Sequence, residues 1–71
     1  MSTEAPVRIF IMHPARPGAP WHVSVEGECP LALDSEAAAV DAALAKVRAC
    51  ETMGLATLVR KERPDGGWEA L

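Results

Sequence analysis

The fold is decided by one stretch of the chain, SEAAAVDAALAKVRACETMG at residues 35–54. It is rich in alanine and has no proline or glycine before its last residue, so its intrinsic helical preference is high. Asp34 or Ser35 can accept a hydrogen bond from the first free amides, and Gly54 can take the left-handed conformation that commonly closes a helix. The stretch therefore predicts a helix from about Ser35 to Met53.

Apolar and small side chains recur on this helix at spacings of three and four residues. This periodicity predicts one apolar stripe against a sheet, and because most of its members are small, the helix can approach the sheet closely. If Leu44 belongs to this stripe, Leu44→Ala costs about 2–5 kcal/mol of stability. The predicted stripe consists of Ala37, Val40, Ala43, Leu44, Val47 and Cys50.

Strand patterns lie on both sides of the helix. Val7–Met12 is β-branched and aromatic, and Trp21–Glu26 alternates strictly between apolar and polar side chains. After the helix, Leu55–Glu62 predicts a third strand, and the turn signal Pro64–Gly67 leads to a short fourth strand at Trp68–Leu71. The pattern predicts an α+β fold in β-β-α-β-β order, with an antiparallel-rich sheet of three to four strands and one helix packed on one face. We expect a single domain over residues 5–71, preceded by a disordered N-terminus at residues 1–4.

The first predicted strand is apolar on both of its faces. Val7, Ile9 and Ile11 point one way, while Phe10 and Met12 point the other. Such a strand needs cover on both sides, and two explanations fit. Either it lies centrally in its own sheet, with the helix on one face and loop side chains on the other, or a second molecule covers it.

Composition narrows the classes of function. The chain has 71 residues, a formal net charge of −3 and 24% charged residues, so its average field weakly repels phosphate backbones and disfavours nucleic acid as a partner. No apolar run approaches the roughly 20 residues of a membrane span, and an acidic residue stands where a secretory signal carries basic ones. We therefore expect a cytoplasmic protein with no membrane contact. Nucleic-acid binding remains an alternative if the basic side chains gather on one face: Arg8, Arg16, Arg60, Lys61 and Arg63.

The residues that could carry chemistry form no recognised motif. The two cysteines, Cys29 and Cys50, are far from Cys-x-x-Cys spacing, and a zinc site would have to recruit His13 and His22 from separate segments. A catalytic site would have to combine one of these histidines with Asp65, Glu26 or Cys29. We expect no enzyme activity, no metal and no cofactor.

Most of the chain resembles a family of short bacterial domains of unknown function. The resemblance lies in the Trp-x-Val strand at Trp21–Gly27, the Glu-Ala helix opening at Glu36-Ala37, Leu58-Val59, and the Asp-Gly turn at Asp65-Gly66. It extends from about Ile9 to Trp68 and implies a small β-rich sheet with one helix. It implies no catalytic residues.

A shorter segment, from about Trp21 to Lys46, is similar to antitoxins that form a partial ribonuclease-H-like sheet. Their usual Leu-Pro-Gly-Cys segment corresponds here only to Glu28-Cys29-Pro30-Leu31. This second resemblance implies an antitoxin-like regulatory role.

These observations favour a non-enzymatic interaction module that forms a homodimer through its sheet, with a protein partner as a further possibility. A nucleic-acid-binding or antitoxin-like regulatory protein is the alternative. The candidate interface residues are Phe10, Met12, Arg60 and Trp68. Trp68 also has an alternative role, since a tryptophan in so small a protein can close the open end of the core instead of forming an interface.

Overall fold

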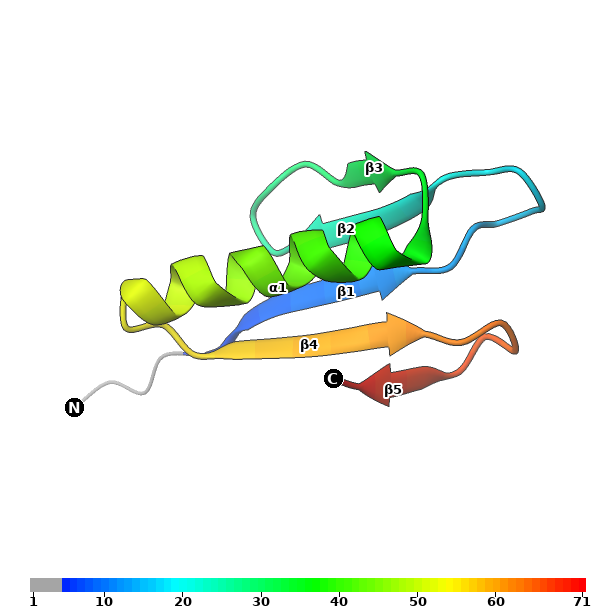
Figure 1. Cartoon of the computed structure of the whole chain (residues 1–71). Helices are drawn as coiled ribbons and strands as arrows, with labels where there is room; N and C mark the ends of the chain where they lie inside the picture. The colour runs from blue at the N-terminus through cyan, green and yellow to red at the C-terminus, as the bar shows by residue number, and fades with distance from the viewer. Residues whose placement is uncertain (1–4) are drawn as a thin grey trace.

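The computed structural model describes residues 5–71, so the prediction for residues 1–4 lies outside the described residues. It contains one helix and five strands (Figure 1). The elements are β1 (Val7–Met12), β2 (Trp21–Val25), β3 (Leu31–Leu33), α1 (Glu36–Thr52), β4 (Thr57–Glu62) and β5 (Trp68–Ala70). The predicted α+β class and the single helix on one face of the sheet are confirmed.

The five strands form one mixed sheet in the order β3-β2-β1-β4-β5. The prediction of three to four strands was wrong, because the sheet has five. The prediction of an antiparallel-rich sheet also needs correction, because β1 pairs antiparallel with β2 but parallel with β4. The parallel pair arises because α1 runs back along the sheet before the chain enters β4 beside β1 (Figure 1). β1 is thus the central strand of the sheet. A central position was one of the two explanations for apolar side chains on both of its faces.

The additional strand is β3, which pairs antiparallel with β2 at the edge of the sheet. Its three residues follow Pro30 directly. A segment this short is below the length at which alternation can be recognised, so only its pairing with Trp21 and Val23 defines it as a strand.

The predicted helix boundaries are confirmed within a residue or two. The hydroxyl of Ser35 accepts a hydrogen bond from the amide of Ala38 at 3.1 Å, which makes Ser35 the N-cap. Gly54 follows the helix with φ of 76°, a conformation that side-chain-bearing residues rarely adopt.

The predicted stripe on α1 needs correction. Leu44 is 39% exposed and Ala37 is exposed, so both were wrongly assigned to the core. Ala43 and Cys50 are buried as the stripe predicts, and Ala39, which lies outside the predicted stripe, is fully buried as well. The face that meets the sheet is therefore rotated toward the smallest side chains, which allow the helix backbone to approach the strands closely.

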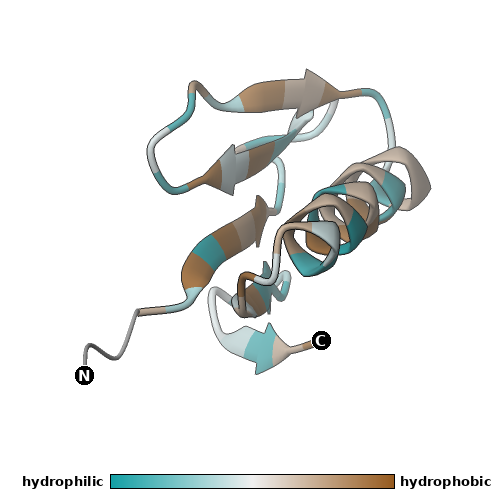
Figure 2. Cartoon of the chain, turned by 90° about the vertical axis from the view of Figure 1, so that its left-hand side faces the viewer, coloured by the Kyte–Doolittle hydropathy of each residue, from teal (hydrophilic) through white to brown (hydrophobic). Residues whose placement is uncertain are grey.

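The core lies between α1 and one face of the sheet. Ile9 and Ile11 are fully buried, and they contact Val23, Val25 and Val59 from the neighbouring strands. Figure 2 shows the helix along this side of the sheet, with apolar residues distributed along the strands. No helix of the described residues is long and apolar enough to cross a membrane. Within residues 5–71, α1 is the only helix, and it leaves the opposite face of the sheet uncovered.

Candidate interaction surface

Side chains on the uncovered face alternate with those of the core. Because successive side chains of a strand point to opposite sides, the neighbours of Ile9 and Ile11 lie on the face away from α1. We call this side of the sheet the open face. Its members in β1, β2 and β4 are Arg8, Phe10, Met12, His22, Ser24, Leu58, Arg60 and Glu62.

β5 adds a large aromatic side chain to the open face. Trp68 pairs with Glu62 and Ala70 pairs with Arg60, which places both β5 residues on the same side as their partners. The rings of Trp68 and Phe10 meet edge to face, with centroids 5.6 Å apart. Trp68 is still 45% exposed, so it does not close the end of the core. The two rings form an aromatic contact on the surface.

The structure brings all four predicted interface residues together on the open face. Phe10 and Met12 come from β1, Arg60 from β4 and Trp68 from β5. Phe10, Met12 and Arg60 are half-buried, so each is held in place by neighbours while part of its surface faces solvent. Residues from three strands thus form one continuous patch.

The five other members of this face in β1, β2 and β4 are not among the predicted interface residues. Leu58 extends the apolar surface beside Arg8, and Glu62 and His22 flank the end that carries Met12. Alternation within Leu55–Glu62 would have placed Leu58 and Glu62 with Arg60. It could not have shown that β4 lies directly beside β1, because the parallel pairing depends on the helix return.

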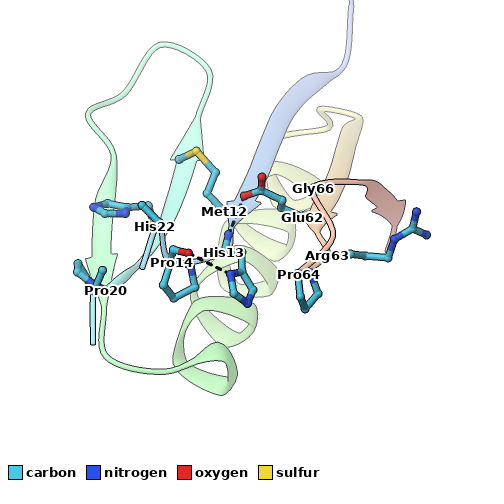
Figure 3. Close-up of a pocket in the computed structure, with 11 residues that line it drawn as sticks. Met12, His13, Pro14, Pro20, His22, Glu62, Arg63, Pro64 and Gly66 are labelled. Carbon is cyan, nitrogen blue, oxygen red and sulfur yellow. Dashed lines mark hydrogen bonds between the residues drawn. The ribbon is translucent and has the colours of Figure 1, made fainter. Parts of the chain in front are cut away.

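A hollow of about 450 Å³ lies at one end of the open face, between the β1–β2 loop and the β4–β5 turn (Figure 3). After β1 the chain turns to β2 on one side, and after β4 it turns to β5 on the other, which leaves a crevice at the carboxyl ends of the two parallel strands. Its polar lining residues are His13, His22, Glu62 and Arg63. Three prolines, two alanines, Met12 and Gly66 form the rest of the wall.

The polar groups around this hollow are largely engaged with neighbouring chain. The amide of His13 donates to Oε1 of Glu62 at 3.0 Å, which ties the end of β1 to the end of β4. Nδ1 of His13 lies 3.1 Å from the carbonyl oxygen of Pro14, and the His13 ring packs edge to face on Trp21. Arg63 Nε lies 3.5 Å from Oδ1 of Asp65.

The groups that a zinc site or catalytic site would need are not brought together. Cys29 is exposed in the β2–β3 turn and Cys50 is buried on α1, whereas the histidines lie by the hollow. Among residues 5–71, no group of three or more His, Cys, Asp or Glu side chains could hold a metal ion. The hydrogen bonds within the same range join neither His13 nor His22 to Asp65, Glu26 or Cys29.

The five basic residues are also divided among different parts of the molecule. Arg8 and Arg60 lie on the open face, but Lys61 points to the helix side, where it meets Glu36. Arg63 pairs with Asp65 in the β4–β5 turn, and Arg16 belongs to the β1–β2 loop. The surface that a nucleic acid would need is therefore not assembled from these side chains.

Comparison of the chain with protein families, with curated proteins and with solved structures finds no match.

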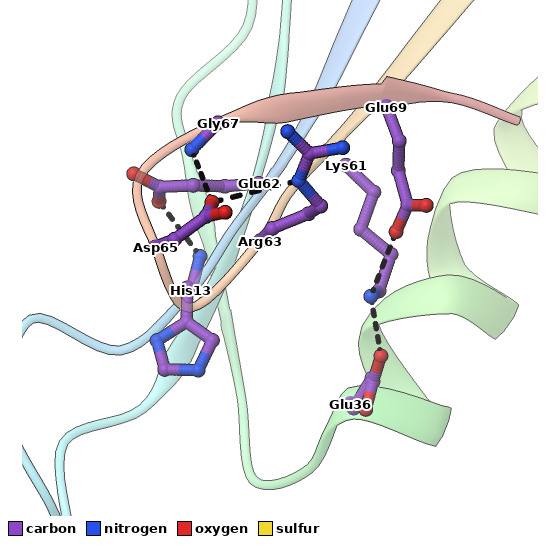
Figure 4. A network of polar contacts seen from close by, with 8 residues as sticks. All are labelled: His13, Glu36, Lys61, Glu62, Arg63, Asp65, Gly67 and Glu69. Atoms are coloured by element: carbon purple, nitrogen blue, oxygen red, sulfur yellow. Dashed lines mark hydrogen bonds and ion pairs between the residues drawn. The ribbon is translucent and has the colours of Figure 1, made fainter.

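On the helix side, Lys61 links three elements (Figure 4). Its Nζ lies 2.6 Å from a carboxylate oxygen of Glu36 in α1 and 3.5 Å from one of Glu69 in β5, and it lies 5.9 Å from the ring centroid of Trp21. The hydrogen bond to Glu36 raises the pKa of Lys61 and outweighs the loss of hydration, which lowers it; the charges of Glu36 and Glu69 add to the rise. In the adjacent turn, the amide of Gly67 donates to Asp65 and, together with Arg63, holds the pKa of Asp65 below its usual range.

We expect Lys61→Met to lower the denaturant midpoint at neutral pH, because it leaves Glu36 and Glu69 without their shared cation. Because the pKa of Lys61 is raised in the folded state, its contribution to stability is complete below the unfolded pKa of about 10.4. This contribution is lost as the pH rises through the folded pKa. The difference between wild type and variant should therefore shrink above about pH 10.4 in chemical denaturation followed by circular dichroism. Arg48→Met, which removes an exposed helix cation, serves as the control. A difference that stays constant into the alkaline range would contradict this role of Lys61.

Proposed function

We propose that this protein is a non-enzymatic interaction module that binds a second copy of itself through the open face of its sheet. The observation that carries the proposal is the aromatic and apolar patch on that face. Phe10, Met12 and Trp68 gather there with Leu58, on the side of the sheet that α1 does not cover. Exposed apolar patches of this kind, edged by polar side chains, are typical of protein interaction sites.

Two properties of the patch suit a protein partner. Tryptophan and arginine are the residue types most enriched where binding energy concentrates, and Trp68 and Arg60 lie in it together. The patch also lies on regular strands, so its side chains are held by the sheet and lose little freedom on binding. A two-fold symmetric pair would bury the same patch on both copies, which is the commonest arrangement of homo-oligomers.

The test is the molar mass of the purified protein over a range of concentrations, measured by sedimentation equilibrium. We expect the 7.6 kDa chain to approach twice its mass at high micromolar concentration. The variant Phe10→Ser/Trp68→Ser should weaken association by about 30-fold or more, because a buried tryptophan in an interface centre contributes about 2 kcal/mol or more. A wild-type chain that stays monomeric at high micromolar concentration would refute the proposal.

Leu44→Ser is the matched control. Leu44 is also a partly exposed apolar side chain, but it lies on α1, on the other side of the sheet. Its replacement should leave the association unchanged while circular dichroism reports the fold of all three proteins. Strong retention on heparin that is lost at moderate salt would instead favour the nucleic-acid alternative, and a stoichiometric complex with a different protein would favour the antitoxin-like role.

A further inference from the structure

The open face carries its charges in a fixed order along the strands. In β4, Arg60 is followed two residues later by Glu62, and in the adjacent β1 the side chain beside Arg60 is Phe10. Met12 is the next open-face residue of β1 toward the carboxyl end. The face therefore has one row with Phe10 and Arg60, and a second row, one step along the strands, with Met12 and Glu62.

The two charged groups that β4 places on the open face are positioned by contacts with the backbone. Arg60 is half-buried, and its guanidinium donates to the carbonyl oxygen of Val59 at 3.3 Å. Glu62 is also half-buried, and Oε1 accepts the amide of His13, so its carboxylate is held at the edge of the patch. If a second sheet covers this face, each charge must meet an opposite charge, since burial of an unpaired charge is costly.

In the aligned class of sheet packing the strands of the two sheets lie within about 30° of each other, so the strands of the second copy run either parallel or antiparallel to those of the first. In a parallel pair with its axis between β1 and β4, Arg60 faces Phe10 and Glu62 faces Met12. In a parallel pair with the two-fold axis along β4, Arg60 faces the other Arg60 and Glu62 faces the other Glu62. In a parallel pair with the two-fold axis along β1, Arg60 faces Ser24. In an antiparallel pair with its axis between the two rows, Arg60 faces Glu62 and Phe10 faces Met12.

We propose that two copies pack open face to open face with antiparallel strands, so that Arg60 of each copy lies opposite Glu62 of the other. This inference rests on the proposed self-association and adds its orientation and register. Of the arrangements above, it alone places an opposite charge against Arg60 and against Glu62 while Phe10 meets an apolar side chain. Two-fold symmetry produces the ion pair twice, side by side on β4, with Phe10 of β1 and Trp68 of β5 on the flanking strands.

The test exchanges the two charges within one chain. Arg60→Glu and Glu62→Arg each place two like-charge pairs across the interface, so each should raise the dimer dissociation constant at least about tenfold. The double variant Arg60→Glu/Glu62→Arg restores both opposite pairs with unchanged net charge, and its dissociation constant should return to within about threefold of wild type. Sedimentation equilibrium at low and high salt measures all four proteins.

Matched controls separate this effect from general charge and folding effects. Arg16→Glu in the β1–β2 loop and Glu51→Arg on α1 make the same charge changes at exposed positions away from the open face, and neither should alter the dissociation constant. Glu62→Gln keeps an oxygen for the amide of His13, so it distinguishes loss of charge from loss of that hydrogen bond. Circular dichroism verifies that each variant is folded.

The outcomes distinguish the two proposals. A monomeric wild type overturns self-association itself. A wild-type dimer that neither single exchange weakens, or that the double exchange fails to restore, overturns the antiparallel register while self-association stands.

A second measurement applies if Glu62→Arg does not fold. The register places Ser24 of one copy opposite His22 of the other, because these residues pair with Phe10 and Met12 across β1 and β2. In a Cys29→Ser background, a mixture of Ser24→Cys and His22→Cys chains should therefore cross-link with a short bis-maleimide faster than either chain alone. Equal cross-linking in the mixture and in the separate chains would overturn the register.

Discussion

Ile11→Ala is expected to lower the free energy of unfolding by about 2–5 kcal/mol. Ile11 is fully buried in the central strand, and it belongs to the one hydrophobic core that the described residues form. Truncation removes most of its side chain and leaves a cavity that the flanking strands cannot fill without losing their register. In so small a domain, this loss is a large part of the total stability. Urea denaturation followed by circular dichroism measures it.

Leu44→Ala is the comparison for this prediction. Both changes shorten a branched apolar side chain to alanine, but Leu44 is 39% exposed. We now expect it to cost well below the 2–5 kcal/mol that its place in the helical periodicity indicated, because a half-exposed side chain leaves no closed cavity. Equal losses for the two variants would mean that the helix packs on the sheet through a different face.

Ala43→Leu is expected to destabilise the protein by about 1–3 kcal/mol, although it adds apolar surface. Ala43 is fully buried where α1 contacts the sheet, beside the equally buried Ala39. A larger side chain at this position must push the helix away from Ile9 and Ile11 or adopt a strained rotamer. The midpoint of thermal unfolding, followed at a helix-sensitive wavelength, should fall accordingly.

Ala37→Leu tests the same substitution on the same helix at an exposed position. The side chain has room there, and leucine is a good helix former, so we expect a change within about 0.5 kcal/mol. The helical periodicity places Ala37 and Ala43 on the same stripe. Different effects of Ala37→Leu and Ala43→Leu therefore distinguish the predicted stripe from the observed contact face. A stabilising effect of Ala43→Leu would show that the helix does not lie close to the sheet.

Local sequence was sufficient for the helix and for four of the five strands. The helix has strong capping residues at Ser35 and Gly54, and the strand Trp21–Val25 has unbroken alternation, so each is encoded within its own residues. The four candidate interface residues could also be singled out locally, as large or charged side chains near strand ends and turns. None of these inferences required knowledge of which segments are neighbours.

The tertiary structure alone decided the pairings and the face that each side chain occupies. Trp68 could close the core or lie on the surface, and only the pairing of β5 with β4 sets its ring against Phe10. β3 is defined by its partner strand, and the contact face of α1 depends on how closely alanines let it approach the sheet. Periodicity and capping depend on residues a few positions apart, whereas sheet order and helix rotation depend on packing between segments tens of residues apart. For that reason the sequence determined the elements of this protein, and packing determined the surface that they form.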